Sequence, residues 1–203
     1  NQLSSLKKKI LYFGLIITAG LSLSGCTDLD EKVFSEVTES NFIPSESDIV
    51  AIMASAYTPM LYVMGWQGLF DLQEEPADVF VTPTRPNGWD DGGTYKRMHF
   101  HEWTKTEYQP RNTWITCFNG INAANRVMLQ MESGKFPISE EQKIAILAEM
   151  RAVRALYYSI LVDTHGNVPI IPNYSDKLPE QNTRLEVYNF IVQEMEAADS
   201  MVK

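Results

Sequence analysis

One short stretch, Thr84-Arg-Pro-Asn-Gly-Trp-Asp-Asp-Gly-Gly-Thr-Tyr95, carries the residue types of a sugar-binding site. Trp89 stands among turn-forming residues that cannot build a local core around its indole. An indole stacks on the apolar face of a pyranose, while amides, carboxylates and guanidinium groups bond its hydroxyls. The stretch therefore predicts carbohydrate contacts at Trp89, Arg85, Asn87 and Asp90.

A second interpretation of Trp89 stays open. A tryptophan between turns can also fold back and close the edge of a core, because its ring is large and mostly apolar. The sequence does not separate a displayed indole from a buried one. Trp66 and Trp103 are rival candidates for an aromatic contact with a ligand.

Residues that could support catalysis or bind a metal form only weak patterns. The pairs Glu74-Glu75 and Asp90-Asp91 are neighbours in sequence, and such neighbours seldom face each other across a glycosidic bond. His99 and His101 would point the same way from a strand, but they lack the further ligands of a metal site. The sequence also lacks a phosphate-binding glycine loop, a zincin histidine pair and a G-x-S-x-G elbow. We expect no enzyme activity, no metal and no other cofactor.

The amino-terminal residues resemble an export signal. Lys7-Lys-Lys9 precede an uncharged apolar run, residues 10–23, which is shorter than the roughly 20 residues that a spanning helix needs. Leu23-Ser-Gly-Cys26 then resembles the lipobox of bacterial lipoproteins, in which the cysteine is acylated after cleavage. We predict a lipoprotein signal peptide at 1–25 and lipid attachment at Cys26, since two or more acyl chains give stable anchoring.

Charge and cysteine content narrow the possible partners. The chain has 26 acidic and 17 basic residues, a formal net charge of −9, so no basic field attracts nucleic acid. Asp28, Asp30 and Glu31 make residues 26–37 acidic, which suits a solvated tether between the lipid and the fold. These acids equally resemble the acid-rich stretch that follows the cysteine in surface-exported lipoproteins of the Bacteroidetes. If Cys26 carries lipid, Cys117 has no disulfide partner and should be a small buried residue on a helix.

Hydrophobic periodicity predicts an all-α fold for residues 38–203. Capping boxes at Ser45, Ser139 and Thr183 precede apolar residues at helical spacing. Pro59 should kink or end the first helix, and Gly166 should follow the end of a later one. The expected helices cover residues 45–62, 111–131, 139–163 and 184–202. They predict helix pairs forming a superhelix, with a long irregular region at about 65–110 where function should be sought.

Glu149, Arg151 and Arg154 share one predicted helix. The two arginines could clamp an anionic ligand. Ion pairs between neighbouring helices are the favoured interpretation, because the apolar surface continues through Tyr157 and Leu161. His165, beside Gly166, is expected to cap the same helix.

The region from Ala148 to Ile171 resembles the signature of the SusD/RagB family. It holds Ala-Glu-x-Arg, then Arg-Ala and a tyrosine pair, then Gly-Asn-Val-Pro. Residues 113–125 resemble the family's tryptophan-containing helix that ends in asparagine, residues 184–198 resemble the helix after the signature, and the lipobox fits the amino-terminal end.

This resemblance implies an outer-membrane lipoprotein facing the cell exterior and built on tetratricopeptide-like helix pairs. Such proteins bind oligosaccharides without cleaving them and cover a SusC-like TonB-dependent transporter. Family members are typically more than twice as long, so the chain should be an amino-terminal portion. Two alternatives remain: a helical glycoside hydrolase, and a helical scaffold that binds proteins and no sugar.

Overall fold

The computed structural model describes residues 44–203, apart from residues 86, 88 and 176. The predicted signal peptide, Cys26 and the acidic tether lie outside the described residues. The described part is all-helical, without a β-strand, and no helix in it is long and apolar enough to cross a membrane. Its helices are α2 (Glu46–Val63), α3 (Leu69–Glu74), α4 (Thr94–His99), α5 (Tyr108–Glu132), α6 (Glu140–Thr164) and α7 (Arg184–Val202).

The four long helices confirm the predicted helical segments to within a few residues. Their starts follow from local hydrogen bonds. Ser139 Oγ accepts from the Gln142 N–H at 3.1 Å, while the Ser139 N–H donates to the Gln142 side chain at 2.9 Å. The same reciprocal pattern joins Thr183 and Glu186 at the start of α7.

The structure refines two local expectations. Pro59 does not end α2, which continues to Val63. A proline removes only one helical donor, and Val63 is fully buried in the core, so packing holds the last turn in place. The region expected to be irregular holds two short helices, α3 and α4, between stretches without regular structure.

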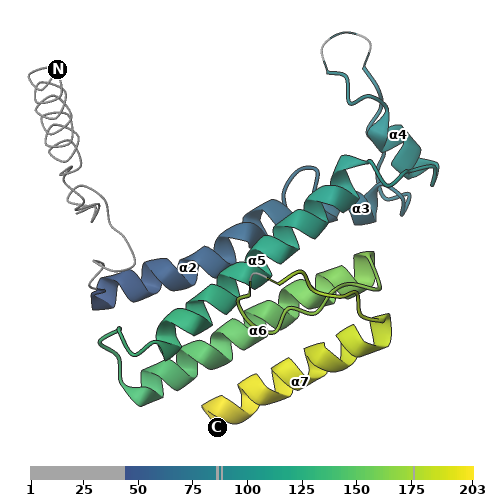
Figure 1. Ribbon diagram of the computed structural model, residues 1–203. Helices are drawn as coiled ribbons and strands as arrows, with labels where there is room; N and C mark the ends of the chain where they lie inside the picture. Colours follow the sequence, from purple (N-terminus) through teal and green to yellow (C-terminus); the bar gives the residue numbers. More distant parts are fainter. Residues whose placement is uncertain (1–43, 86, 88, 176) are drawn as a thin grey trace, which may run out of the picture. The chain divides into compact units, whose positions relative to one another are not determined.

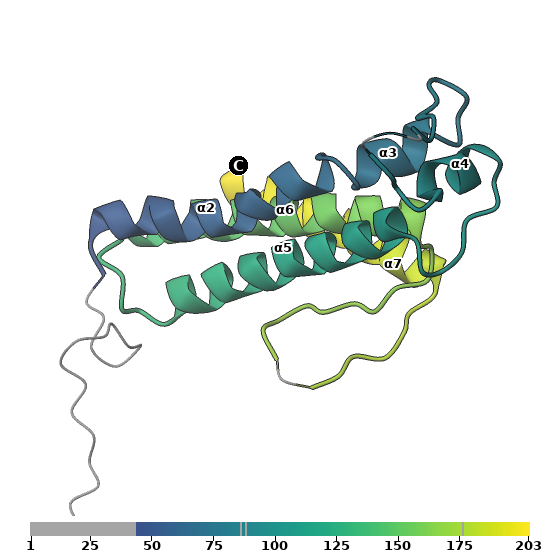
Figure 2. The same cartoon turned by 90° about the horizontal axis from the view of Figure 1, so that it is seen from above.

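Helices α2, α5, α6 and α7 lie side by side, each packed on the next (Figure 1). Successive members run in opposite directions (Figure 1). Figure 2 shows the same row from above, with α3 and α4 at one end. This is the helix-pair architecture that the periodicity predicted.

Close contact between α5 and α6 depends on one glycine. A Cβ on Gly120 would lie 2.2 Å from the ring of Tyr157, so only glycine leaves room for that ring. The Tyr157 hydroxyl donates to the Ala56 carbonyl at 2.7 Å and thereby connects α6 to α2. Cys117 is fully buried nearby, and burial raises the pKa of its thiol to about 12, which confirms the expected small buried residue.

The arginines of α6 form internal ion pairs. Arg154 is buried and its Nε donates to Glu194 on α7 at 2.9 Å, while Arg151 donates to the other oxygen of Glu194 at 2.9 Å. Arg154 also donates to Asn125 on α5 and to the carbonyl of Pro172. This confirms the structural interpretation of both arginines, because one buried cluster ties three helices together.

The end of α6 also matches its prediction. His165 is the C-cap residue, and Gly166 follows with a φ of 74°, a left-handed conformation that favours glycine. The His165 ring lies 3.1 Å from the Pro110 carbonyl and 2.7 Å from the Thr164 hydroxyl. Burial lowers the pKa of this histidine.

Candidate functional site

The connecting segment, residues 65–107, joins α2 to α5 and contains α3 and α4 (Figure 1). Most of it has no regular backbone ladder, so its polar groups need other partners. Three buried carboxylates, Asp71, Glu75 and Glu107, supply many of them. The shape of the segment therefore depends on side-chain hydrogen bonds.

Asp71 and Glu75 fix the first half of the segment. Asp71 Oδ2 accepts from the Tyr95 hydroxyl at 2.6 Å and from the Gln67 N–H at 2.8 Å. Glu75, one turn later, accepts from the N–H of Thr82 at 3.3 Å and also from its hydroxyl. Burial, together with the bond to Asp71, raises the pKa of Tyr95, so its hydroxyl stays a donor.

Glu107 fixes the second half. Arg97 on α4 donates to its two oxygens at 2.6 and 2.8 Å, and the hydroxyl of Thr94 donates at 2.6 Å. The Arg97 guanidinium, with help from Thr94, lowers the pKa of Glu107 to about 2. Glu107 directly precedes α5, so this pair joins α4 to the helical row.

A glycine turn carries the predicted sugar-binding stretch into α4. Gly92 and Gly93 have φ values of 63° and 77°, which other residues rarely adopt. Asp91 accepts from the N–H groups of Gly93 and Tyr95, both at 3.0 Å. Asp90 accepts from the Gly92 N–H at 2.9 Å. The turn is therefore held by its own aspartates.

The four predicted sugar contacts lie just before this turn. Arg85, Asn87 and Asp90 are exposed, and Trp89 is half-buried. The indole lies 5.7 Å from the Tyr95 ring at an interplanar angle of 44°. Within residues 44–203 as described, no hydrogen bond joins any two of the four side chains. Their role in binding sugar stays a prediction, and Trp89 packs in part on a buried tyrosine.

The two rival tryptophans are more exposed than Trp89. Trp66 is 68% exposed directly after α2, and Trp103 is 43% exposed beyond α4. The Trp103 ring meets the edge of His101 at 5.8 Å.

The histidine pair does not have the geometry considered for a metal. His99 ends α4 and His101 follows with a φ of 56°, so the two do not alternate along a strand. His101 Nε2 lies 2.8 Å from the Pro76 carbonyl. In the described ranges, no group of three or more histidine, cysteine or acidic residues is placed to hold a metal ion.

The residues that frame the segment were not identified from the sequence. Tyr95 meets Asp71 across 24 positions, and Arg97 meets Glu107 across 10. Neither spacing repeats or matches a helical period, so no local pattern marks these pairs. The sequence does not show which acids are buried; only the folded structure shows that Asp71, Glu75 and Glu107 are.

Comparison with known proteins identifies the family. A model of SusD-like proteins described as "Starch-binding associating with outer membrane" matches residues 29–203. SusD-like protein P25 of Formosa agariphila is 26% identical over 160 residues, covering 77% of this chain and 30% of that protein.

Solved structures with the same fold agree. A laminarin-binding SusD-like protein superposes with a TM-score of 0.65 at 24% identity, over 77% of this chain and 34% of its own. Surface glycan-binding protein A from Bacteroides uniformis gives 0.63 at 21% identity, over 78% and 35%. The chain thus spans about a third of the length of these relatives. Because the family model matches most of the chain, the protein belongs to the SusD-like family.

Proposed function

We propose that this chain is the amino-terminal portion of a surface-exposed lipoprotein that binds oligosaccharides without cleaving them. It delivers them to a SusC-like TonB-dependent transporter in the outer membrane. The observation that carries the proposal is the match of residues 29–203 to the starch-binding SusD-like model. Two similar structures are named for binding laminarin and surface glycans, which favours the same ligand class.

The connecting segment is where we propose that sugar is bound. Its framing acids are buried and already bonded, whereas Arg85 and Asn87 are exposed and free to meet hydroxyl groups. Exposed Asp90 uses one carboxylate oxygen in the glycine turn and keeps the other for a ligand. Trp89 rests against Tyr95, which restricts the orientation of the indole. A restricted aromatic ring binds a sugar face with a smaller loss of conformational entropy.

Replacement of Trp89 tests the site. In the full-length protein, Trp89→Ala should weaken retention on affinity gels containing starch or laminarin by roughly tenfold, the effect of about one lost aromatic contact. Helicity by circular dichroism should not change. Trp103→Ala is the matched control and should bind like the wild type. Unaltered retention by Trp89→Ala would exclude this site, and release of reducing ends by the wild type would instead indicate a hydrolase.

The proposed anchor has its own test. Cys26→Ala should leave the precursor uncut at Gly25 and unable to incorporate labelled palmitate. Cys117→Ala is the matched control, because Cys117 is buried in the helical core and should not affect labelling. Normal incorporation in Cys26→Ala cells would refute lipid attachment at this residue.

A further inference from the structure

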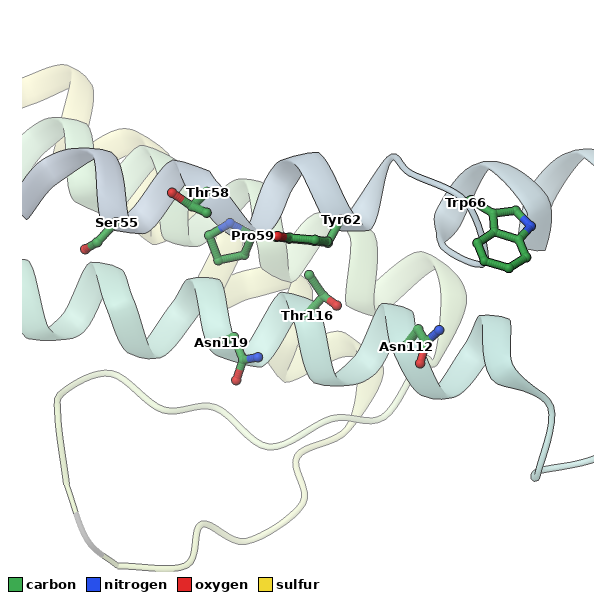
Figure 3. Close-up of a pocket in the computed structure, with 8 residues that line it drawn as sticks. All are labelled: Ser55, Thr58, Pro59, Tyr62, Trp66, Asn112, Thr116 and Asn119. Atoms are coloured by element: carbon green, nitrogen blue, oxygen red, sulfur yellow. The ribbon is translucent and has the colours of Figure 1, made fainter. Parts of the chain in front are cut away.

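A cavity lies outside the proposed site, between α2 and the first half of α5 (Figure 3). Its volume is about 510 Å³, within the range of small-ligand sites. The eight residues that line it are aromatic, hydroxyl-bearing or amide-bearing, with one proline: Ser55, Thr58, Pro59, Tyr62, Trp66, Asn112, Thr116 and Asn119.

The lining residues form polar stripes on two facing helices. On α2, Ser55, Thr58 and Tyr62 follow at intervals of three and four. On α5, Asn112, Thr116 and Asn119 do the same, so each set shares one helix face over about 10 Å. Elsewhere these two helices meet through apolar side chains such as Ala56 and Ile121. This face is instead polar and open.

Aromatic rings stand at one end of the cavity. Tyr62 is 69% exposed and Trp66 is 68% exposed, large fractions for side chains of this size. Figure 3 shows the Tyr62 ring beside Pro59, with Trp66 further along toward α3. Exposed rings next to hydroxyl and amide groups match the two faces of a sugar, one apolar and one hydrogen-bonding.

The polar groups of the cavity keep bonding capacity. The Ser55 and Thr58 hydroxyls donate to helix carbonyls at 2.6 and 3.0 Å, which leaves their oxygens free to accept. Asn112 donates to the Gln67 carbonyl at 3.3 Å and keeps its oxygen available. Asn119 has no side-chain hydrogen bond to any residue that the structure describes. Pro59 has no N–H, so the Ser55 carbonyl one turn earlier lacks its helical donor.

The charge of the lining residues restricts the class of glycan that the cavity can bind. None of the eight lining residues is charged at neutral pH, in a chain with a net charge of −9. A uronic-acid or sulfated glycan would need a cation here to offset its own charge. A neutral oligosaccharide needs only the amides, hydroxyls and rings that are present.

We propose that this cavity is a second sugar subsite, selective for neutral oligosaccharides. The inference rests on the proposed function and extends it. Trp66 lines the cavity and is also part of the connecting segment that carries Trp89, so this segment contributes to both proposed sites.

The test uses full-length protein on affinity gels with neutral starch, laminarin and xylan, and with acidic alginate and polygalacturonate. Tyr62→Ala should weaken retention on the neutral polysaccharide that the wild type binds by roughly tenfold, and Asn119→Ala by about threefold. Both side chains lie at the surface, so circular dichroism and melting should not change. Tyr188→Ala, an exposed tyrosine on α7, is the matched control and should bind normally.

The possible outcomes of this test distinguish the second subsite from the proposed function on which it rests. Loss of binding in Tyr62→Ala and Asn119→Ala with a normal Tyr188→Ala supports the subsite. Wild-type binding that neither variant weakens overturns the subsite and leaves the proposed function standing. Binding restricted to the acidic polysaccharides overturns the neutral selectivity. A wild type that no polysaccharide retains overturns both proposals.

Discussion

The helical row and the connecting segment are stabilised in different ways. In α2, α5, α6 and α7 the buried side chains are mostly apolar and pack tightly, as at Gly120 and Tyr157. In the connecting segment, Asp71, Glu75 and Glu107 are buried and accept hydrogen bonds from residues several positions away. Between its two short helices, the segment thus uses carboxylates as substitute partners for its polar groups.

This difference separates the residues that stabilise the fold from the exposed residues that are available to a ligand. In the connecting segment buried carboxylates frame the chain, whereas the exposed side chains of Arg85 and Asn87 take no part in that frame. In the helical row a buried polar cluster around Arg154 and Glu194 joins helices. We therefore expect substitutions in the row to change stability, and substitutions at the surface of the segment to change binding.

The largest expected effect is in the helical row, at Glu194. Glu194→Ala removes the carboxylate that Arg151 and Arg154 share and leaves the Arg154 guanidinium buried without its counter-ion. Breaking such a pair costs about 3–5 kcal/mol of unfolding free energy. Urea unfolding followed by circular dichroism measures it. The exposed Glu196→Ala is the control, and a loss below about 1 kcal/mol at Glu194 would contradict the role of this cluster.

Gly120→Ala comes next and tests the packing of the row. The added Cβ would overlap the Tyr157 ring, which should lower the unfolding free energy by up to about 3 kcal/mol. In a Tyr157→Leu background the ring is absent, so the same substitution should cost much less. Equal costs in the two backgrounds, measured as a double-mutant cycle, would show that Gly120 does not act through Tyr157.

Glu107→Gln tests whether the buried carboxylates hold the connecting segment in place. Near pH 7 it should lower the unfolding free energy by about 2 kcal/mol, because hydrogen bonds to a charged group are lost. The pKa of Glu107 is about 2, below its ordinary 4.5. Its contribution is therefore complete above pH 4.5 and lost as pH falls toward 2, where the two proteins should converge. The exposed Glu102→Gln should differ little from wild type at any pH, and a pH-independent Glu107→Gln gap would refute the pairing.

The smallest effect on stability is expected at the exposed residues that we propose to contact sugar. Arg85→Ala and Asn87→Ala should each change the unfolding free energy by less than about 0.5 kcal/mol, since both side chains are exposed. Retention on the polysaccharide gel should nevertheless fall. A stability loss above about 1 kcal/mol at either residue would show that these exposed side chains also stabilise the segment, as its buried carboxylates do.

Local signals account for the parts of the fold that were predicted. A capping box such as Ser139 and Gln142 acts over three residues, and apolar spacing follows the 3.6-residue turn, so both are visible in the sequence. Gly166 was predicted for a similar local reason. Pro59 does not end α2, because tertiary packing outweighs short-range preference there.

The two candidate sites differ in the same way, because one lies within a short stretch of sequence and the other is formed by two separate helices. Composition alone drew attention to Trp89, Arg85, Asn87 and Asp90, because sugar-binding chemistry needs aromatic and polar side chains together. It did not distinguish the cavity of Tyr62 and Asn119, whose members lie on two helices about 60 residues apart in the chain. Helix periodicity can place each residue on a face, but only packing decides which faces meet.

The sequence by itself determined the four long helices, their caps and the SusD-like signature, since each depends on contacts within a few turns of chain. Only the tertiary structure decided that Glu194 joins Arg154, that Tyr95 meets Asp71, and that α2 and α5 enclose a polar cavity. Those contacts bring together residues distant in sequence. Their energy comes from burial and from hydrogen-bond geometry, which exist only once the helices have packed.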